Sequence, residues 1–332
     1  MENALIGRYE GAEMTNDVKI IAEFCQNHNG NFEILRKMLN DAVESGASYA
    51  KIQTIFAKDL SFRERFENGL VDDTGIAVSI RRPYREEYER LKNLELSYEQ
   101  QSEFVSLCRI AGIEPLTTAF NLDSIPEIYN CDFKSIKIAS YDCASIPLLK
   151  SAASCFSEVI VSTGATYPEE IESAVKILNT SGVAYSLLHC VTIYPTPLNK
   201  MNLLRMMKLK DHTANFGLSS HPLNSIDGIK ADLVAIFLGA KLIERHFTVL
   251  SESDTRDGKV SINNLQLSEI VTFSHLNKND QLEYLSEHVP EYEECLGKAD
   301  AVLSSDELLN RDYYRGRFCN RVEGDEVFNW EM

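Results

Sequence analysis

Short apolar runs with β propensity alternate with segments of helical spacing along most of this chain, and this alternation constrains the fold most. We predict eight strands, each followed by a helix or helical segment: 18–24, 49–54, 113–120, 135–140, 158–162, 183–190, 215–220 and 241–248. Buried strands that alternate with helices indicate a parallel sheet. Eight such units within roughly 230 residues predict a (β/α)₈ TIM barrel, an α/β fold, over residues 18–298.

An open, doubly wound sheet is the alternative. It would have a glycine-rich phosphate loop after the first strand, where this chain has Gln26-Asn27-His28-Asn29-Gly30. Outside the barrel we expect an N-terminal arm over 1–17 and a C-terminal extension over 299–332. Residues 55–96 are the least regular part and are expected to cross the barrel mouth with one helix. Predicted helices include 97–111, with a Ser97/Gln100 capping box, 224–238 and a final helical region over 264–298.

Charge and composition exclude several classes of partner. The 332-residue chain has a formal net charge of −17, which argues against nucleic acid and against an anionic membrane surface. Neither a signal peptide nor an apolar run of membrane-spanning length is evident. The eight cysteines are scattered without a C-x-x-C pair, so we interpret them as reduced thiols and expect a cytoplasmic protein.

Charged residues follow the apolar start of the last strand, Lys241-Leu242-Ile243-Glu244-Arg245-His246-Phe247. Side chains of a strand alternate between faces, so Glu244 and His246 share one face and Arg245 takes the other. The active sites of (β/α)₈ barrels lie at the carboxyl ends of the strands. We therefore expect Glu244 and His246 in the site, and Arg245 in a structural ion pair with the helical layer.

Two histidines, His221 and His246, end consecutive strands. Neutral imidazoles suit a divalent transition metal, and two protein ligands would leave positions open for water or substrate. The alternative is that both histidines are polar residues at the barrel rim.

Two lysines, Lys51 and Lys137, also end strands, together with hydroxyl residues: Thr118, Ser140 and Ser162. Ammonium groups beside hydroxyl donors suit a phosphate or carboxylate, although each residue alone could be a solvated rim residue. A lysine in such a barrel could instead form a Schiff base with a carbonyl substrate. Glu23, at the end of the first strand, supplies a carboxylate for acid–base work.

Eight short motifs resemble, in order, those of the sialic acid synthase family, the phosphoenolpyruvate-dependent nonulosonate synthases. They are Ile21-Ala22-Glu23 with Asn27-His28-Asn29-Gly30; Lys51-Ile52-Gln53-Thr54; Thr117-Thr118-Ala119-Phe120; Lys137-Ile138-Ala139-Ser140; Ser162-Thr163-Gly164; His189-Cys190 with Tyr194-Pro195-Thr196-Pro197; Gly217-Leu218-Ser219 with His221; and Glu244-Arg245-His246-Phe247-Thr248. One such motif is weak, whereas eight in family order are specific.

The resemblance implies a (β/α)₈ enzyme, commonly a homodimer, that condenses phosphoenolpyruvate with an N-acylated mannosamine-type sugar. The products would be a nine-carbon 2-keto-3-deoxy acid and phosphate. By the same resemblance His221 and His246 would hold Mn²⁺, or Mg²⁺ or Co²⁺ in its place. Phosphoenolpyruvate would contact Lys51, Thr118, Lys137, Ser140, Ser162 and Ser219. The sugar and the reacting centre would be lined by Glu23, Gln53 and Tyr194, while Glu244 would orient ligands or pair with a lysine. A Schiff-base aldolase and a non-catalytic sugar-phosphate binder are the alternatives.

Three departures from the family pattern stand out. Ser220 replaces the usual aspartate between Ser219 and His221, and by alternation it faces away from them. The acidic residue that usually follows Thr248 closely is absent, and Asp254 or Asp257 is the candidate replacement. We also expect only an incomplete form of the C-terminal antifreeze-like domain that is common in the family. Residues 310–328 resemble only its opening strands, and they contain candidates for the arginine that this domain offers to the sugar: Arg311, Arg315 and Arg317.

Overall fold

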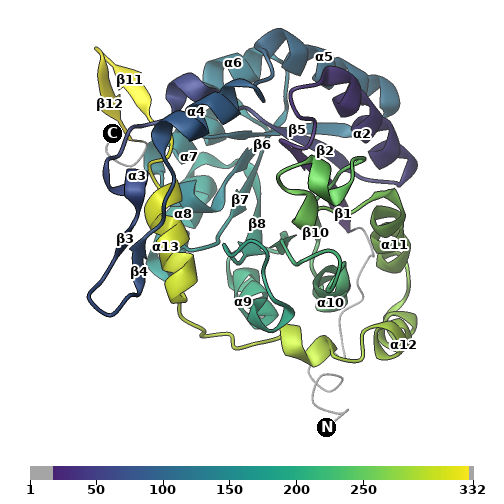
Figure 1. The fold of residues 1–332 in the computed structure, drawn as a ribbon. Helices are drawn as coiled ribbons and strands as arrows, with labels where there is room; N and C mark the ends of the chain where they lie inside the picture. The colour runs from purple at the N-terminus through teal and green to yellow at the C-terminus, as the bar shows by residue number, and fades with distance from the viewer. Residues whose placement is uncertain (1–17, 329–332) are drawn as a thin grey trace.

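Eight parallel strands form a closed barrel in the computed structural model, which describes residues 18–328 (Figure 1). The order around the barrel is β1-β10-β9-β8-β7-β6-β5-β2. The strands are β1 Lys19–Cys25, β2 Tyr49–Gln53, β5 Glu114–Ala119, β6 Ser135–Ile138, β7 Glu158–Ser162, β8 Ala184–Cys190, β9 Phe216–Ser220 and β10 Leu242–His246. The predicted barrel is therefore confirmed, with every strand end within two residues of its expected position. The arm predicted over 1–17 lies outside the described residues.

The register of neighbouring strands brings the predicted site residues side by side. Glu23 on β1 pairs with His246 on β10 and with Lys51 on β2. Thr118 on β5 pairs with Lys137 on β6. Since residues that pair across parallel strands point to the same side of the sheet, all five side chains enter the barrel.

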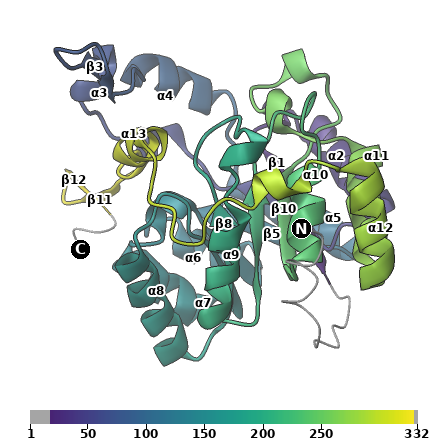
Figure 2. The ribbon, with the colours of Figure 1, turned by 90° about the horizontal axis from the view of Figure 1, so that it is seen from below.

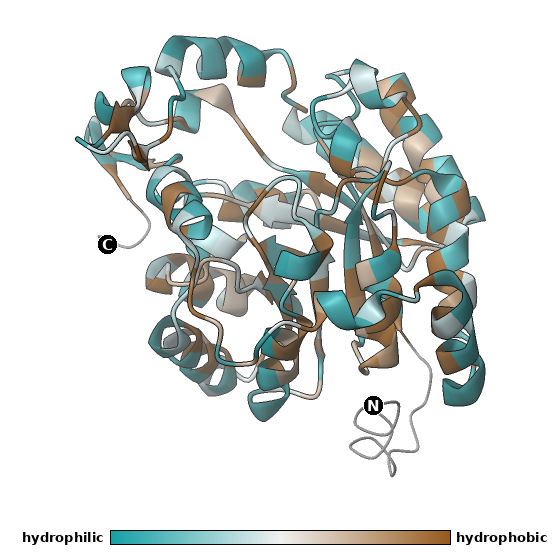
Figure 3. Ribbon diagram, turned by 60° about the horizontal axis from the view of Figure 1, so that its bottom comes forward, coloured by the Kyte–Doolittle hydropathy of each residue, from teal (hydrophilic) through white to brown (hydrophobic). Residues whose placement is uncertain are grey.

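Two apolar cores support this polar end of the barrel. The interior is filled below it by Ile21, Tyr49, Leu116, Ile160, Leu188 and Leu242. A larger core lies between strands and helices, where Phe24 of β1 packs against Phe104 and Phe247. Burying one such side chain contributes about 1.5–3 kcal/mol. Figure 3 shows that the surrounding helices carry both hydrophobic and hydrophilic faces, as expected for helices that cover a sheet.

The helices around the barrel follow the predicted order. They are α2 Phe32–Glu44, α5 Tyr98–Ala111, α6 Ile125–Asn130, α7 Ile146–Cys155, α8 Pro168–Ser181, α9 Leu203–Lys208, α10 Lys230–Phe237, α11 Asn264–Ser274 and α12 Lys278–His288. The predicted capping box of α5 is confirmed, because the Ser97 hydroxyl accepts from the Gln100 N–H at 3.3 Å and the Gln100 side chain accepts from the Ser97 N–H at 2.9 Å. Within residues 18–328 no helix has the length and apolar character needed to cross a membrane, and all eight cysteines carry free thiols.

Two predicted helices differ from the observed ones. The helix expected over 224–238 begins only at Lys230, because Gly228 adopts a positive φ of 51° in the preceding turn. The region expected to be helical over 264–298 is split into α11, α12 and a 3₁₀ turn at Tyr292–Cys295. The split occurs where the Asn277 side chain accepts from the backbone N–H groups of Asn279 and Asp280 and starts a new helix.

Residues 55–96 and the C-terminal segment gather at one end of the barrel (Figure 2). The first contains α3 Arg65–Asn68, α4 Tyr84–Lys92 and a hairpin of β3 Leu70–Val71 with β4 Ala77–Ser79, whereas one helix was expected. The second contains α13 Ser305–Tyr314 and a hairpin of β11 Asn320–Val322 with β12 Asp325–Val327. Residues 310–314, expected in a strand, are thus helical, because a Ser304/Glu307 capping box starts α13.

The C-terminal segment is tied directly to the first excursion. The Ser61 hydroxyl donates to the Gly316 carbonyl at 2.6 Å, and Leu60 forms an antiparallel bridge with Phe318. Arg63 donates to the carbonyls of Tyr313 and Arg315 at 2.5 and 3.1 Å. These bonds hold the end of α13 beside the barrel mouth.

Candidate active site

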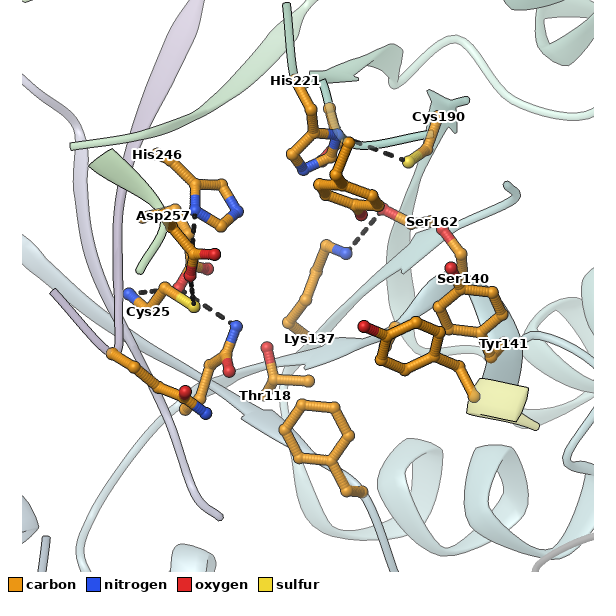
Figure 4. A pocket seen from close by; sticks show the side chains of 18 of the residues that line it. Cys25, Thr118, Lys137, Ser140, Tyr141, Ser162, Cys190, His221, His246 and Asp257 are labelled. Carbon is orange, nitrogen blue, oxygen red and sulfur yellow. Dashed lines mark hydrogen bonds and ion pairs between the residues drawn. The ribbon is translucent and has the colours of Figure 1, made fainter. Parts of the chain in front are cut away.

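A cavity of about 310 Å³ opens at the carboxyl ends of the strands. All twelve residues predicted for the site line it: Glu23, Lys51, Gln53, Thr118, Lys137, Ser140, Ser162, Tyr194, Ser219, His221, Glu244 and His246. Figure 4 shows side chains from separate strands, among them Lys137, His221 and His246, pointing into this one space. The structure therefore brings these twelve residues together in one cavity.

Two lysines and two carboxylates form a buried network at the cavity floor. Lys51 contacts Glu23, and its Nζ lies 3.6 Å from Oε2 of Glu244. Lys137 Nζ lies 3.8 Å from Oε1 of Glu244. Burial alone would raise the pKa of Glu244, but Lys137, Lys51 and a 2.8 Å bond from the Ser219 hydroxyl lower it to about 2. The predicted pairing of Glu244 with strand-end lysines is confirmed.

For Lys51, burial lowers the pKa instead of raising it. It lowers the pKa of Lys51 to about 7, although Glu244 acts to raise it and Lys137 lowers it further. Lys51 and Lys137 are each only 3% exposed. Because buried ammonium groups are costly, a small anion that enters the cavity would gain from contact with both.

Two of the hydroxyl residues form hydrogen bonds within the cavity wall, one of them with a lysine. Lys137 Nζ donates to the Ser162 hydroxyl at 2.6 Å, and the Ser140 hydroxyl accepts from the Gly164 N–H at 3.1 Å. A Cβ at position 164 would lie 2.8 Å from Ser140 Oγ and 2.7 Å from Thr192 Cγ2. Only glycine lets the loop after β7 approach Ser140 so closely.

The two histidines face one another at the mouth-side ends of β9 and β10. Their ring centroids lie 5.0 Å apart at an interplanar angle of 72°, and Tyr194 packs on His221 at 4.1 Å. Burial lowers the pKa of His221 well below its usual value, and the neighbouring His246 lowers it further. Burial also lowers the pKa of His246, against the opposing effect of Asp257. Both imidazoles are therefore neutral, the form that binds metals.

The groups around His246 fit a divalent cation. Its Nδ1 is buried and has no hydrogen-bond partner within residues 18–328, and Asp257 Oδ2 lies 3.8 Å away. The Cys25 thiol donates to the same carboxylate oxygen at 3.0 Å. Ligand atoms of Cys25, His246 and Asp257 lie within 4.8 Å of one another. Of the two candidates for the missing family carboxylate, Asp257 lines the cavity, whereas Asp254 does not.

Arg245 lies on the other side of the sheet, as alternation predicts. It is fully buried, its Nε lies 3.6 Å from the Asp232 carboxylate of α10, and its Nη1 donates to the Ser220 hydroxyl at 3.1 Å. Ser220 in turn donates to Asp232 at 2.5 Å. The predicted structural ion pair is confirmed, and so is the outward orientation of Ser220.

Arginines at the cavity mouth are the main group that sequence reasoning missed. Arg82, Arg90 and Arg256 line the cavity together with Arg317, which was one of three candidates from the C-terminal segment. The other two candidates, Arg311 and Arg315, pair instead with Glu170. The sequence offered one signal for these arginines, the Arg81-Arg82 pair within residues 55–96. No sequence signal indicated three other residues that line the cavity: Gln26, Glu87 and Tyr314.

Comparison with known proteins identifies the family of this chain. The model of the NeuB family matches residues 38–281. The chain belongs to the NeuB family. It is 32% identical over 258 residues to N,N'-diacetyllegionaminic acid synthase of Campylobacter jejuni, which covers 76% of this chain and 74% of that protein. It is 27% identical to the pseudaminic acid synthase of another strain of that species, over 95% of this chain and 85% of that protein.

Solved structures of other proteins resemble this barrel. The sialic acid synthetase of Leptospira borgpetersenii, solved with citrate, superposes with a TM-score of 0.66 and 26% identity, covering 89% of this chain and 90% of that one. The spore coat polysaccharide biosynthesis protein SpsE of Bacillus subtilis, at 24% identity and a TM-score of 0.68, shares the fold. As a NeuB family member with synthases among its relatives, the protein is a sialic acid synthase-like enzyme.

Proposed function

We propose that this enzyme condenses phosphoenolpyruvate with an N-acylated mannosamine-type aldose, in its open aldehyde form, to a nonulosonic 2-keto-3-deoxy acid and phosphate. One observation carries the proposal: two buried lysines and two neutral histidines converge in one cavity at the carboxyl end of a NeuB-family barrel. A buried cationic floor suits a small, highly charged donor, and neutral imidazoles suit a metal that polarises an aldehyde.

In this proposal the cavity floor binds phosphoenolpyruvate. Lys51 and Lys137 offset the charges of its phosphate and carboxylate, and the hydroxyls of Thr118, Ser140 and Ser162 donate to the remaining oxygens. Support comes from the burial of both lysines and from the short Lys137–Ser162 bond, which fixes the ammonium group. Charged hydrogen bonds in such a dry site are stronger than in water.

His221 and His246 would hold the divalent metal, with Mn²⁺ as our proposal. When bound, the metal acts as a Lewis acid on the aldehyde oxygen of the acceptor. Asp257 accepts from Cys25, and its Oδ2 lies 3.8 Å from Nδ1 of His246, so it would add negative charge near the cation. The Tyr194 ring packs on His221, with 4.1 Å between the ring centroids, and is 47% exposed, so it would be free to pack against the sugar.

The carbon–carbon bond forms when C3 of phosphoenolpyruvate attacks the aldehyde carbon, which places positive charge on C2. The aldehyde oxygen takes up a proton and becomes a hydroxyl. Water then adds at C2, and the resulting tetrahedral adduct breaks its C2–O(phosphate) bond, which releases phosphate and leaves the ketone. We assign Glu23 as the base that takes the proton of this water. Its carboxylate is 1% exposed, contacts Lys51 and accepts from the Gln53 amide at 3.4 Å, so it is held at the floor of the site.

Phosphate release tests the proposal. Purified protein should liberate inorganic phosphate only when phosphoenolpyruvate, Mn²⁺ and a suitable N-acyl amino sugar are all present, and mass spectrometry should detect a nine-carbon keto acid. Replacing Lys137 with Met should abolish release, whereas His212→Ala, outside the cavity, should not change it. Absence of release across a broad panel of neutral and phosphorylated N-acyl hexosamines would rule the proposal out.

A Schiff-base aldolase is the second candidate, and the lowered pKa of Lys51 favours it, because a neutral amine is the nucleophile in that chemistry. Borohydride with pyruvate should then add a stable adduct to Lys51, detectable by peptide mass spectrometry. We expect no adduct, since Lys51 is held against Glu23 and Glu244.

A further inference from the structure

Four arginines meet at the mouth of the cavity, above the strand ends. Arg82 precedes α4, Arg90 lies on α4, Arg256 lies between β10 and α11, and Arg317 follows α13. We call these four residues the mouth cluster. They come from three segments far apart in the sequence, and hydrogen bonds fasten these segments to the barrel or to one another.

Two sets of hydrogen bonds position the mouth cluster. The segment after β10 is fixed by the Thr255 hydroxyl, which donates to the Asn27 side chain at 2.7 Å, and by the Asn29 amide, which donates to the Asp254 carbonyl at 2.8 Å. The C-terminal segment is held by the bonds from Ser61 and Arg63 described above. The arginines are therefore held at the mouth by well-bonded loops.

One carboxylate serves two of these arginines. Arg90 forms a bidentate pair with Glu87, with Nε and Nη2 at 2.9 and 2.8 Å from its oxygens, and its Nη1 donates to the Gln26 side chain at 2.5 Å. Arg317 contacts the same Glu87 carboxylate. Burial would raise the pKa of Glu87, but Arg90 and Arg317 lower it to about 2, so its single negative charge is fixed.

The other two arginines lack such a partner. Within residues 18–328, the side chains of Arg82 and Arg256 form no hydrogen bond or ion pair. Asp257, the next residue along, is directed to Cys25 and His246 instead. The Arg256 side chain is exposed, yet desolvation lowers its pKa and repulsion from Arg90 and Arg82 lowers it further, while Glu87 acts to raise it. Four guanidinium groups and one carboxylate leave a net charge of +3 at the mouth of a chain whose total is −17.

Positive charges held close together around a cavity repel one another, and a bound anion offsets this repulsion. Phosphoenolpyruvate does not fill this role in the mechanism above, because its two anionic groups are met by the buried lysines at the floor. We propose that the mouth cluster binds an anionic group at the end of the acceptor sugar distant from its aldehyde. The acceptor is thus an N-acyl amino sugar that carries a phosphate or a carboxylate, an inference that rests on the proposed function.

A phosphate monoester matches the mouth cluster better than a carboxylate. It carries a charge near −2 at neutral pH and offers three acceptor oxygens to planar guanidinium forks. A sugar acid, with one negative charge, would leave more of the positive charge unbalanced. Both sources share the same recognition chemistry, and the experiment below separates them.

The test compares three acceptors in the phosphate-release assay: N-acetylmannosamine, its 6-phosphate and N-acetylmannosaminuronic acid. We expect kcat/KM for the 6-phosphate to exceed that for the neutral sugar by at least about 100-fold, since two or more charged hydrogen bonds are involved. Arg82→Gln and Arg256→Gln should each reduce this preference about tenfold or more, and neither should lower the Tm, because each substitution relieves repulsion between arginines.

Arg81→Gln is the matched control. Arg81 adjoins Arg82 in sequence, its side chain is 62% exposed, and it pairs with Glu86 outside the cavity. Removing this charge should leave the preference among acceptors unchanged. Preference for the uronic acid over both other sugars would identify a carboxylate as the bound anion. Equal or better turnover of the neutral sugar would overturn the inference and leave the proposed function intact.

Binding alone provides a second readout that does not need turnover. Calorimetry with N-acetylmannosamine 6-phosphate should show affinity that weakens about tenfold or more in Arg256→Gln and falls as salt is added. Binding that is equal for the neutral and phosphorylated sugars would overturn the anion site. If all three acceptors failed to release phosphate while this charge-dependent binding remained, the proposed condensation would fail and the anion site would stand.

Discussion

Oε1 of Glu244 lies 3.8 Å from Nζ of Lys137, with both side chains almost fully buried. Its other oxygen lies 3.6 Å from Lys51, which also contacts Glu23, so Glu244 is shared by two buried cations and Lys137 depends on it more than Lys51 does. Replacing Glu244 with Gln keeps the shape and removes the charge. We expect a loss of about 3 kcal/mol in the free energy of unfolding, because an uncompensated buried charge costs about that much. Urea denaturation followed by circular dichroism measures it.

Glu252→Gln is the control for this charge removal. Glu252 lies in an exposed 3₁₀ turn after β10, so its substitution should change the free energy of unfolding by less than about 0.5 kcal/mol. Equal midpoints for the two variants would show that Glu244 does not compensate the lysines.

Removal of either histidine should weaken Mn²⁺ binding. His221→Ala and His246→Ala each remove one of two proposed protein ligands, and we expect a loss of at least about 100-fold, since substitutions one shell further out already cost 10–100-fold. Titration of free Mn²⁺ by electron paramagnetic resonance gives the affinity without an activity assay. His212→Ala is the control and should bind Mn²⁺ with the affinity of the unsubstituted protein. If His221→Ala and His246→Ala also bound Mn²⁺ with unchanged affinity, neither histidine would be a metal ligand.

Much of this site follows from strand periodicity. Alternation correctly placed Glu244 inside the barrel and Arg245 outside it, because a strand has a fixed two-residue period whatever its tertiary surroundings. The position of the barrel mouth then followed from the fold, since carboxyl ends of parallel strands converge. Contacts within the floor, such as Lys137 with Ser162, follow from the register between neighbouring strands.

The position of the mouth cluster could not be predicted in this way, because its residues do not lie on strands with a regular period. Arg82, Arg256 and Arg317 lie in loops, where side-chain direction is set by contacts between distant segments and not by a repeating backbone. The anchoring bonds of Ser61 to Gly316 and of Asn29 to Asp254 join residues more than 200 positions apart. Local sequence also hid the β3–β4 hairpin, whose strands are only two and three residues long.

Affinity for phosphoenolpyruvate should fall as pH rises above about 7. Burial lowers the pKa of Lys51 to about 7, so its ammonium form is lost in the free enzyme above that pH. Binding an anion favours the charged lysine and must then take up a proton. Between pH 7.5 and 9, where the phosphate is already fully ionised, Kd should rise up to about tenfold per pH unit.

The proton uptake itself can be measured. Calorimetry of phosphoenolpyruvate binding at pH 8, in buffers that differ in ionisation enthalpy, should show a net uptake that approaches one proton. Lys51→Met should bind more weakly and with much less uptake. An affinity that stays constant from pH 7 to 9 would show that Lys51 remains charged in the free enzyme.

Gly164→Ala tests how the loop after β7 shapes the floor. The added Cβ would lie 2.7 Å from Thr192 Cγ2 and 2.8 Å from Ser140 Oγ, so either the loop or Ser140 must move. We expect a loss of about 1–3 kcal/mol in stability from overpacking, together with weaker phosphoenolpyruvate binding as Ser140 is displaced.

Gly112→Ala is the control that separates a loss of stability from a change in the cavity floor. Gly112 has a φ of +75° and open space around it where α5 ends, at the other end of the barrel from the cavity, so alanine there should cost about 1 kcal/mol through backbone strain alone. Its phosphoenolpyruvate affinity should stay unchanged, and an equal loss of affinity in both variants would assign the Gly164 effect to general destabilisation.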